Sequence, residues 1–300
     1  MNRLRIHGIL FCVLSCLLTL AASTVLALGE RAEVTVLASL IFLLGVPHGA
    51  LDPIFAHRLY RVRSWSEWIV FTFAYLALAG LTVLLWKFAP LIFLAGFLSI
   101  ALFHFSGDPE KGTPPLCRLV FGGAIIILPA LRHGSEQLRL LTYLGGNLAG
   151  ATVGSVLHML SVPWLVMVAA VVIVDWRRDW LASVEITAVT LLALFMPPLA
   201  GFTVYFCGMH SSRHILRTIG YAGRKSLFNL VAAATAPMLG SAALFGIAFF
   251  WFRDLAFEAS VIQVIFVVLA ALTVPHMALV ERVRFAGWES SSQMSSQLER

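Results

Sequence analysis

Ten long apolar runs, separated by short polar segments, restrict what this chain can fold into. They cover about residues 7–28, 34–56, 67–87, 88–106, 116–131, 153–174, 181–196, 199–216, 228–251 and 261–280. A helix needs about 20 consecutive apolar residues to cross a membrane, and most of the runs approach this length. The 300-residue chain is 60% hydrophobic and 12% charged, whereas soluble domains are more polar. The sequence therefore predicts an all-α, polytopic integral membrane bundle of about ten transmembrane helices.

Three segments leave alternatives open or lie outside the bundle. Pro197-Pro198 fits either a tight turn between two helices or a break within one helix. The first run follows Arg3 and Arg5, and it fits an uncleaved anchor, which we favour, or a cleaved signal peptide. We expect residues 1–286 to form a single transmembrane domain. Residues 287–300, which are rich in Ser and Gln, are expected to form a disordered cytoplasmic tail.

The distribution of basic residues predicts the orientation of the bundle. With ten helices and a cytoplasmic N-terminus, 16 of the 21 Lys and Arg residues fall on the cytoplasmic side and five on the other. Cytoplasmic loops are enriched in these residues, so we expect both termini in the cytoplasm and a multi-pass protein of the cell inner membrane. Because the basic residues lie in short loops between apolar runs, the net charge of +6 indicates no nucleic-acid partner.

Histidines recur in four of the runs, near the end that this orientation places in the cytoplasm. They are His48, His104, His210 with His214, and His276. Ionisable residues within membrane helices are costly, and they usually face the bundle interior or a polar cavity. We therefore expect these five side chains at a similar depth on one side of the membrane. The remaining histidines are assigned to loops, helix ends or interfaces: His7, His57, His133 and His158.

Two motifs combine one of these histidines with an acid four residues later. V-P-H-G-A-L-D places Asp52 on the helix face of His48, where a carboxylate can accept the second N–H of a metal-bound imidazole. The plainer alternative is that Asp52 marks a helix end before Pro53. H-F-S-G-D repeats the spacing with His104 and Asp108, and its alternative is a polar turn at the membrane interface.

A third motif, H-S-S-R-H, places His210 and His214 at positions i and i+4. This spacing brings two imidazoles to one helical face and is typical of metal ligands. Arg213 lies between them, and we expect it to extend to the cytoplasmic surface. The same is expected of the carboxylate of Glu185, near Arg177 and Arg178.

The string V-P-H-M-A-L repeats the first motif near the C-terminus, but Val280 stands where the first motif has its acid. Three roles stay open for His276: an additional metal ligand, a residue that supports a ligand, or a helix-end histidine. Pro47 and Pro275 each precede a histidine and remove a helix hydrogen bond. They could kink their helices and turn the imidazoles inward, or they could lie near helix ends.

In this order the four motifs, which span residues 45–277, resemble those of the bacteriorhodopsin-related-protein (Brp/Blh) family of β-carotene 15,15′-dioxygenases. The string P-H-G-A-x-D is fairly specific, H-S-x-R-H is less so, and the shared order adds most. The resemblance implies a polytopic membrane protein that uses Fe(II) and O2. It further implies cleavage of β-carotene or a related carotenoid at the central double bond, giving two molecules of all-trans-retinal. The sequence leaves open whether an opsin receives the retinal.

The resemblance also implies roles for particular residues. The candidate iron ligands and catalytic residues are His48, His104, His210 and His214. Asp52 fits the acid of the family motif, while Asp108 and His276 are candidates for a supporting role or an additional ligand. Ser106 replaces a glycine that is expected in many relatives. No substrate-binding residue can be matched.

Other functions can use similar residues. A membrane di-iron hydroxylase or desaturase usually contains adjacent histidine pairs, which this sequence lacks. A metal or proton transporter needs ionisable groups along a path across the membrane, whereas the candidates here gather near one face. A haem-binding electron carrier could use two of the histidines.

Overall fold

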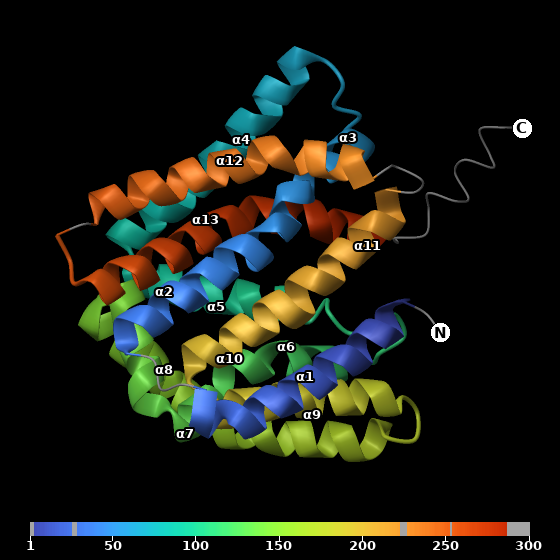
Figure 1. The fold of residues 1–300 in the computed structure, drawn as a ribbon, viewed down its shortest axis with the longest axis vertical. Coiled ribbons are helices and arrows are strands. Elements are labelled where there is room, and N and C mark those ends of the chain that lie inside the picture. Colours follow the sequence, from blue (N-terminus) through green and yellow to red (C-terminus); the bar gives the residue numbers. More distant parts are fainter. Residues whose placement is uncertain (1–2, 26–28, 223–226, 253, 287–300) are drawn as a thin grey trace, which may run out of the picture.

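The computed structural model describes residues 3–25, 29–222, 227–252 and 254–286, and the regular structure in these ranges is helical (Figure 1). The elements are α1 (Arg3–Val25), α2 (Glu30–Leu40), η1 (Ile41–Gly45), η2 (Val46–Leu51), α3 (Asp52–Leu59), α4 (Trp65–Phe88), α5 (Pro90–Phe105), α6 (Pro115–Ile127), α7 (Pro129–Arg132), α8 (Gly134–Asp175), α9 (Trp180–Phe195), α10 (Pro198–Tyr205), η3 (Phe206–Ser211), α11 (Ser212–Ala222), α12 (Leu227–Trp251) and α13 (Phe257–Ala286). The prediction of an all-α chain is confirmed for these residues. The expected tail, residues 287–300, lies outside them.

The lengths and surfaces of the helices indicate a membrane protein. Seven helices in the described part of the chain are long and apolar enough to cross a membrane, and α5 and α9 are shorter apolar helices. The outer side of α4 exposes Ile69, Val70 and Phe73, which suits contact with lipid and would be unfavourable in water. The number of spans and the orientation stay predictions.

The seventh and eighth apolar runs form two separate helices. The backbone is extended at Met196 and Pro197, which ends α9, and Pro198 occupies the first turn of α10. Another helix was not predicted, because residues 134–145 precede the apolar run at 153–174 and contain several polar side chains. It joins the rest of α8 through Gly146, whose φ of 76° lies in the left-handed region that favours glycine.

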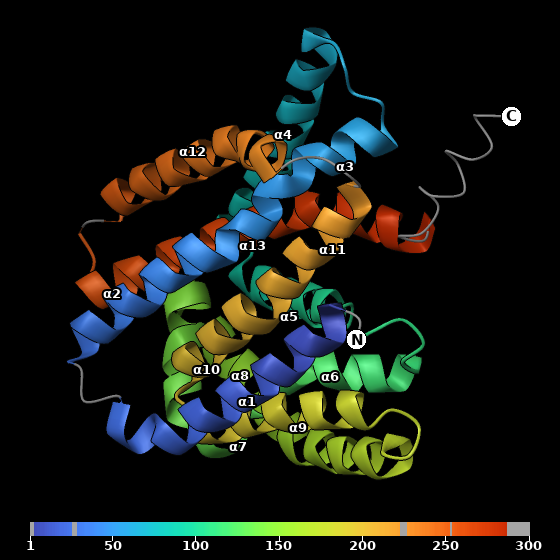
Figure 2. The same cartoon turned by 45° about the vertical axis from the view of Figure 1, so that its right-hand side comes forward.

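The helices that carry the histidines run side by side through the middle of the molecule. Figures 1 and 2 both show α2, α13 and the α10–α11 segment with the same chain direction. On one side α1 packs against α9, and on the other α4 and α12 pack against α13. Helix α1 contributes Phe11, Cys12 and Ser15 to the buried interior. The shared direction of the middle helices brings their C-terminal halves together.

Two of these helices contain a π-helical turn, in which one more residue fits than in an α-helical turn. The first, η1, is followed by the 3₁₀ turn η2, where Pro47 has no N–H for the carbonyl of Leu43. The second is η3. The Ser211 hydroxyl of η3 donates to the carbonyl oxygen of Leu44 at 2.6 Å, so the two π turns are tied together.

The second proline of the V-P-H repeat has a different setting. Helix α13 continues from Phe257 to Ala286, and Pro275 lies well inside it. The alternative that this proline marks a helix end is therefore wrong. His276 is presented from the middle of a long helix and not from its terminus.

Candidate metal centre

Five buried histidines from four helical segments meet in the middle of the bundle. Their exposed fractions are 7% for His48, 6% for His104, 1% for His210, 5% for His214 and 3% for His276. The ring centroid of His48 lies 4.9 Å from that of His210, 5.4 Å from that of His214 and 5.1 Å from that of His276. The centroids of His104 and His210 are 4.6 Å apart. The structure thus brings together all five histidines that the sequence placed at one depth.

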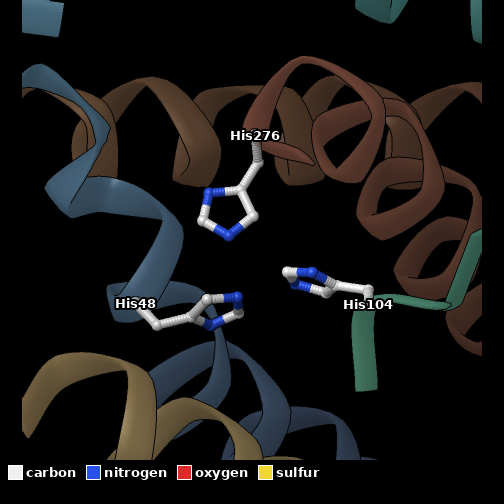
Figure 3. Close-up of side chains that lie close together, drawn as sticks. All are labelled: His48, His104 and His276. Atoms are coloured by element: carbon white, nitrogen blue, oxygen red, sulfur yellow. The ribbon is translucent and has the colours of Figure 1, made fainter. Parts of the chain in front are cut away.

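Three of these rings converge most closely. One ring nitrogen each of His48, His104 and His276 lies within 4.8 Å of the other two, a spacing that can hold a metal ion. Figure 3 shows the three rings pointing toward one another from η2, α5 and α13, with a ring nitrogen of His276 turned to the other two. His276 is therefore as central as the two histidines that the family motifs single out.

Asp52 supports His276 and not the histidine of its own motif. The Nδ1–H of His276 donates to Oδ1 of Asp52 at 2.7 Å, and the hydroxyl of Tyr75 donates to Oδ2 at 2.9 Å. His48 instead donates from Nδ1 to the carbonyl oxygen of Gly45 at 2.5 Å. The expectation of a shared helix face is wrong because residues 46–51 form a 3₁₀ turn. With three residues per turn, positions i and i+4 are about 120° apart.

Asp108 likewise supports a histidine of another helix. The Nδ1 of His210 lies 3.0 Å and 3.1 Å from the two carboxylate oxygens, and the hydroxyl of Tyr205 donates to Oδ2 at 2.6 Å. The expected partner, His104, belongs to α5, which ends at Phe105. Asp108 lies in the turn beyond that end, so the i+4 spacing no longer places it on the face of His104.

The hydrogen bonds at Nδ1 leave Nε2 as the nitrogen that a metal would bind. Within the described residues, Nε2 of His210 and of His276 is buried without a hydrogen-bond partner. Buried polar atoms are nearly always satisfied, so two such nitrogens in one cluster need an explanation. Imidazoles that bind a metal through one nitrogen almost always donate the other N–H to a carboxylate or carbonyl. The residues therefore fit a metal ion bound by histidine.

Two arginines hold the turn that carries Asp108. Arg217 donates to the carbonyl oxygens of Gly107 at 2.7 Å and of Asp108 at 2.6 Å, and Arg213 donates to the latter at 3.0 Å. These donors satisfy carbonyls that the end of α5 would leave without partners. The turn, and with it the carboxylate next to His210, is fixed from α11.

The positions predicted for Arg213 and Glu185 are wrong. Arg213 is fully buried, and its guanidinium pairs with both oxygens of Glu185, at 2.6 Å and 3.0 Å. Glu185 is 2% exposed. The reason is that Arg213 faces the turn after α5 from inside the bundle, where carbonyls need donors and the guanidinium needs a counter-charge. A rule for side chains at membrane interfaces does not include these partners.

An apolar cavity of about 120 Å³ extends from the histidines into the bundle. His48, His104 and His210 line it, while α5, α8, α10 and α13 contribute aliphatic and aromatic side chains such as Phe202 and Phe266. Among the described residues its lining contains no Asp, Glu, Lys or Arg. The sequence did not identify these residues, since an apolar lining has the same composition as an ordinary core.

The other four histidines lie apart from the cluster and bond to backbone or neighbouring groups. His7 contacts the carbonyl oxygen of Gly208 at 2.9 Å, and His57 that of Val62 at 2.8 Å. His158 contacts the carbonyl oxygen of Ala130 at 3.2 Å, and Nδ1 of His133 lies 3.9 Å from the carboxylate of Glu136. These hydrogen bonds and contacts agree with roles at helix ends and between helices.

Comparisons with known proteins agree on one family. Residues 39–283 match the family model described as beta-carotene 15,15′-dioxygenase. A curated beta-carotene 15,15′-dioxygenase of the uncultured marine bacterium 66A03 is 26% identical over 255 residues, which cover 81% of this chain and 91% of the relative. The probable beta-carotene 15,15′-dioxygenase Blh of Halobacterium salinarum is 26% identical, with 87% of each chain covered. No solved structure matches the chain.

Proposed function

Because this chain belongs to the β-carotene 15,15′-dioxygenase family, a family of enzymes, we propose that it cleaves β-carotene or a related carotenoid at the 15,15′ double bond. The reaction uses O2 and gives two molecules of all-trans-retinal. The observation that carries the proposal is the apolar cavity whose wall includes three of the clustered histidines. A hydrocarbon substrate needs such a cavity, and an oxygen-dependent cleavage needs a metal beside the bond that breaks.

We propose Fe(II) as the metal, held by His48, His104, His210 and His214. Imidazole nitrogen suits iron, and the buried nitrogens of the cluster fit this assignment. When bound, the iron supplies the chemistry with O2, which protein side chains do not provide. Asp52 and Asp108 accept the Nδ1 protons of His276 and His210 and thereby fix the tautomer of these rings.

The composition of the cavity suits the balance of the reaction. One carbon–carbon double bond and the bond of O2 break, and two carbonyl groups form. No proton is gained or lost, so the cavity requires no acid or base next to the substrate. This agrees with a lining free of Asp, Glu, Lys and Arg among the described residues. Phe105, Phe202 and Phe206 also line it, and their rings are suited to pack along a polyene.

The membrane is part of the proposed function. A carotenoid partitions into the bilayer, so it can reach the cavity laterally between apolar helices. We propose that residues 1–286 form one transmembrane unit of the cell inner membrane with both termini in the cytoplasm, as the basic residues predict. An opsin is a candidate recipient for the retinal.

Expression in bacteria that accumulate β-carotene tests this function. We expect the orange colour to fade and retinal to form in a 2:1 ratio to the carotenoid lost. His210→Ala, which removes a proposed ligand, should leave the carotenoid intact at the same protein level. If the wild-type chain leaves β-carotene untouched under air with sufficient iron, the substrate assignment is wrong. Two irons per purified chain would instead support a di-iron hydroxylase or desaturase.

A further inference from the structure

Two groups of three side chains with the same chemistry approach the histidine cluster from different helices. In the first, the Tyr75 hydroxyl donates to one oxygen of Asp52, and His276 donates from Nδ1 to the other. In the second, Asp108 accepts from Tyr205 and from Nδ1 of His210. All the acids and histidines of these two arms are buried. Because the tyrosine and the acid of each arm come from different elements, the repetition does not follow from a local sequence motif.

The tyrosine hydroxyl determines what the carboxylate can do. A buried carboxylate is costly unless its lone pairs accept hydrogen bonds, and it can also bind a metal directly. Tyr75 occupies the oxygen of Asp52 that His276 leaves free, and its hydroxyl lies 3.3 Å from the carbonyl oxygen of Leu272, one turn before His276. The carboxylate is thereby held as an acceptor for the imidazole and is not free to turn toward the centre.

A purely structural role for the first arm would be a link between η2–α3 and α13. Such a link needs only Nδ1 of His276. In the structure the same ring also has its Nε2 buried without a hydrogen-bond partner among the described residues. One nitrogen of the ring is grouped within 4.8 Å of nitrogens of His48 and His104. A structural link gives no reason to bury an unsatisfied nitrogen beside two other imidazoles, whereas a metal ion does.

We propose that His276 is an additional ligand of the metal centre and that Tyr75 is a positioning residue, acting through Asp52 to aim its Nε2. Tyr205 has the matching role for His210 through Asp108. This inference rests on the metal centre of the proposed function, but it does not depend on the identity of the substrate.

Binding of Co(II), an iron substitute with a visible absorption spectrum, tests the inference on the purified full-length protein in detergent. Removing a group that supports a metal-binding histidine typically costs 10–100-fold in metal affinity. We expect His276→Gln and Asp52→Asn to weaken Co(II) binding by about this factor and to shift its absorption bands. For Tyr75→Phe, which keeps the ring and loses the hydroxyl, we expect a shift of the bands and a roughly tenfold loss of affinity.

Tyr143→Phe is the matched control, because this tyrosine is half-buried in α8 and lies outside both arms. It should bind Co(II) as the wild type does. The glutamine at position 276 can still accept a hydrogen bond or donate to Asp52, so a folded variant is expected, and its thermal unfolding in detergent checks this. An unchanged affinity and spectrum in folded His276→Gln would overturn the ligand assignment. Unchanged spectra in Tyr75→Phe would overturn the positioning role.

Carotenoid turnover, measured separately, keeps the two proposals distinguishable. If Co(II) binding depends on His276 as expected but the iron-loaded wild type leaves carotenoids intact, the proposed function fails and this inference stands. If carotenoid is cleaved and Co(II) binding is indifferent to His276, the reverse holds. A wild type that binds neither Co(II) nor iron would refute both.

Discussion

Replacing Glu185 by glutamine would leave the guanidinium of Arg213 buried without its counter-charge. The side chain of Arg213 is 0% exposed and that of Glu185 is 3% exposed, and two hydrogen bonds of 2.6 Å and 3.0 Å join them. A charge that loses its partner inside a protein cannot recover hydration, so the substitution acts on desolvation as well as on the pair itself. The amide of the variant keeps one acceptor oxygen, and the carbonyl of Asp108 still accepts from Arg213 at 3.0 Å.

These contacts determine the expected size of the effect. Breaking a buried ion pair by removing one partner costs about 3–5 kcal/mol. With two acceptors left, Glu185→Gln should lie near the lower end, about 3 kcal/mol, and Glu185→Leu near the upper end. Combining Glu185→Leu with Arg213→Met removes both charges. This double variant should lie within about 1–2 kcal/mol of the wild type, because it loses a hydrogen bond to Asp108 but leaves no buried charge.

Unfolding in mixed detergent micelles by increasing amounts of SDS, followed by far-UV circular dichroism, measures these free energies. The matched control is Glu30→Gln, because Glu30 pairs with Arg139 at 2.7 Å while both side chains are about half exposed. That variant should lose less than about 1 kcal/mol. If Glu185→Gln is no more destabilising than Glu30→Gln, the reasoning from burial is refuted.

Three further outcomes follow from the structure. Ala101 lines the cavity on α5, so Ala101→Phe should lower carotenoid cleavage by roughly 100-fold at unchanged iron content; Ala95→Phe on the exposed side of the same helix should not, and equal activities would contradict the position of the cavity. A Cβ at Gly8 would collide with the carboxylate of the buried ion pair, so Gly8→Ala should destabilise the fold by about 1–3 kcal/mol in the SDS titration, whereas Gly80→Ala, which has open space, should not. Removing the metal with a chelator should abolish cleavage and lower the melting temperature, and added Fe(II) should restore both, since a ligand of the folded state stabilises it; full activity without detectable metal would exclude the iron centre.

The helices and the histidine cluster could be predicted because both depend on simple periodic properties. Apolar runs located the long helices, and the cost of an imidazole in lipid indicated that the five histidines share the interior. Residues 134–145 escaped because their polar side chains interrupt the apolar pattern, although they form a helix. The break at Pro197 could be predicted as a break, but the extended backbone that makes it a turn between two helices depends on packing.

The partners of the histidines could not be predicted, because they come from other helices. Sequence spacing linked Asp52 to His48 and Asp108 to His104, whereas the structure links these acids to His276 and His210. The i+4 rule assumes an uninterrupted α-helix, and both motifs depart from one, by a 3₁₀ turn in the first and by a helix end in the second. A tyrosine from a third element completes each arm, and no spacing rule identifies it.

The π-helical turn at Ile41–Gly45 makes the centre sensitive to the length of the chain at this position. Deleting one residue there would restore a regular α-helix with nearly the same hydropathy and almost the same length. Everything beyond the deletion would, however, rotate by about 100° around the helix axis, because an α-helix has 3.6 residues per turn. His48 would leave the cluster while the helix itself could become more regular. A relative that lacks one residue here would keep the membrane profile and the V-P-H-G-A-L-D motif, yet it would have lost the direction in which its histidine points.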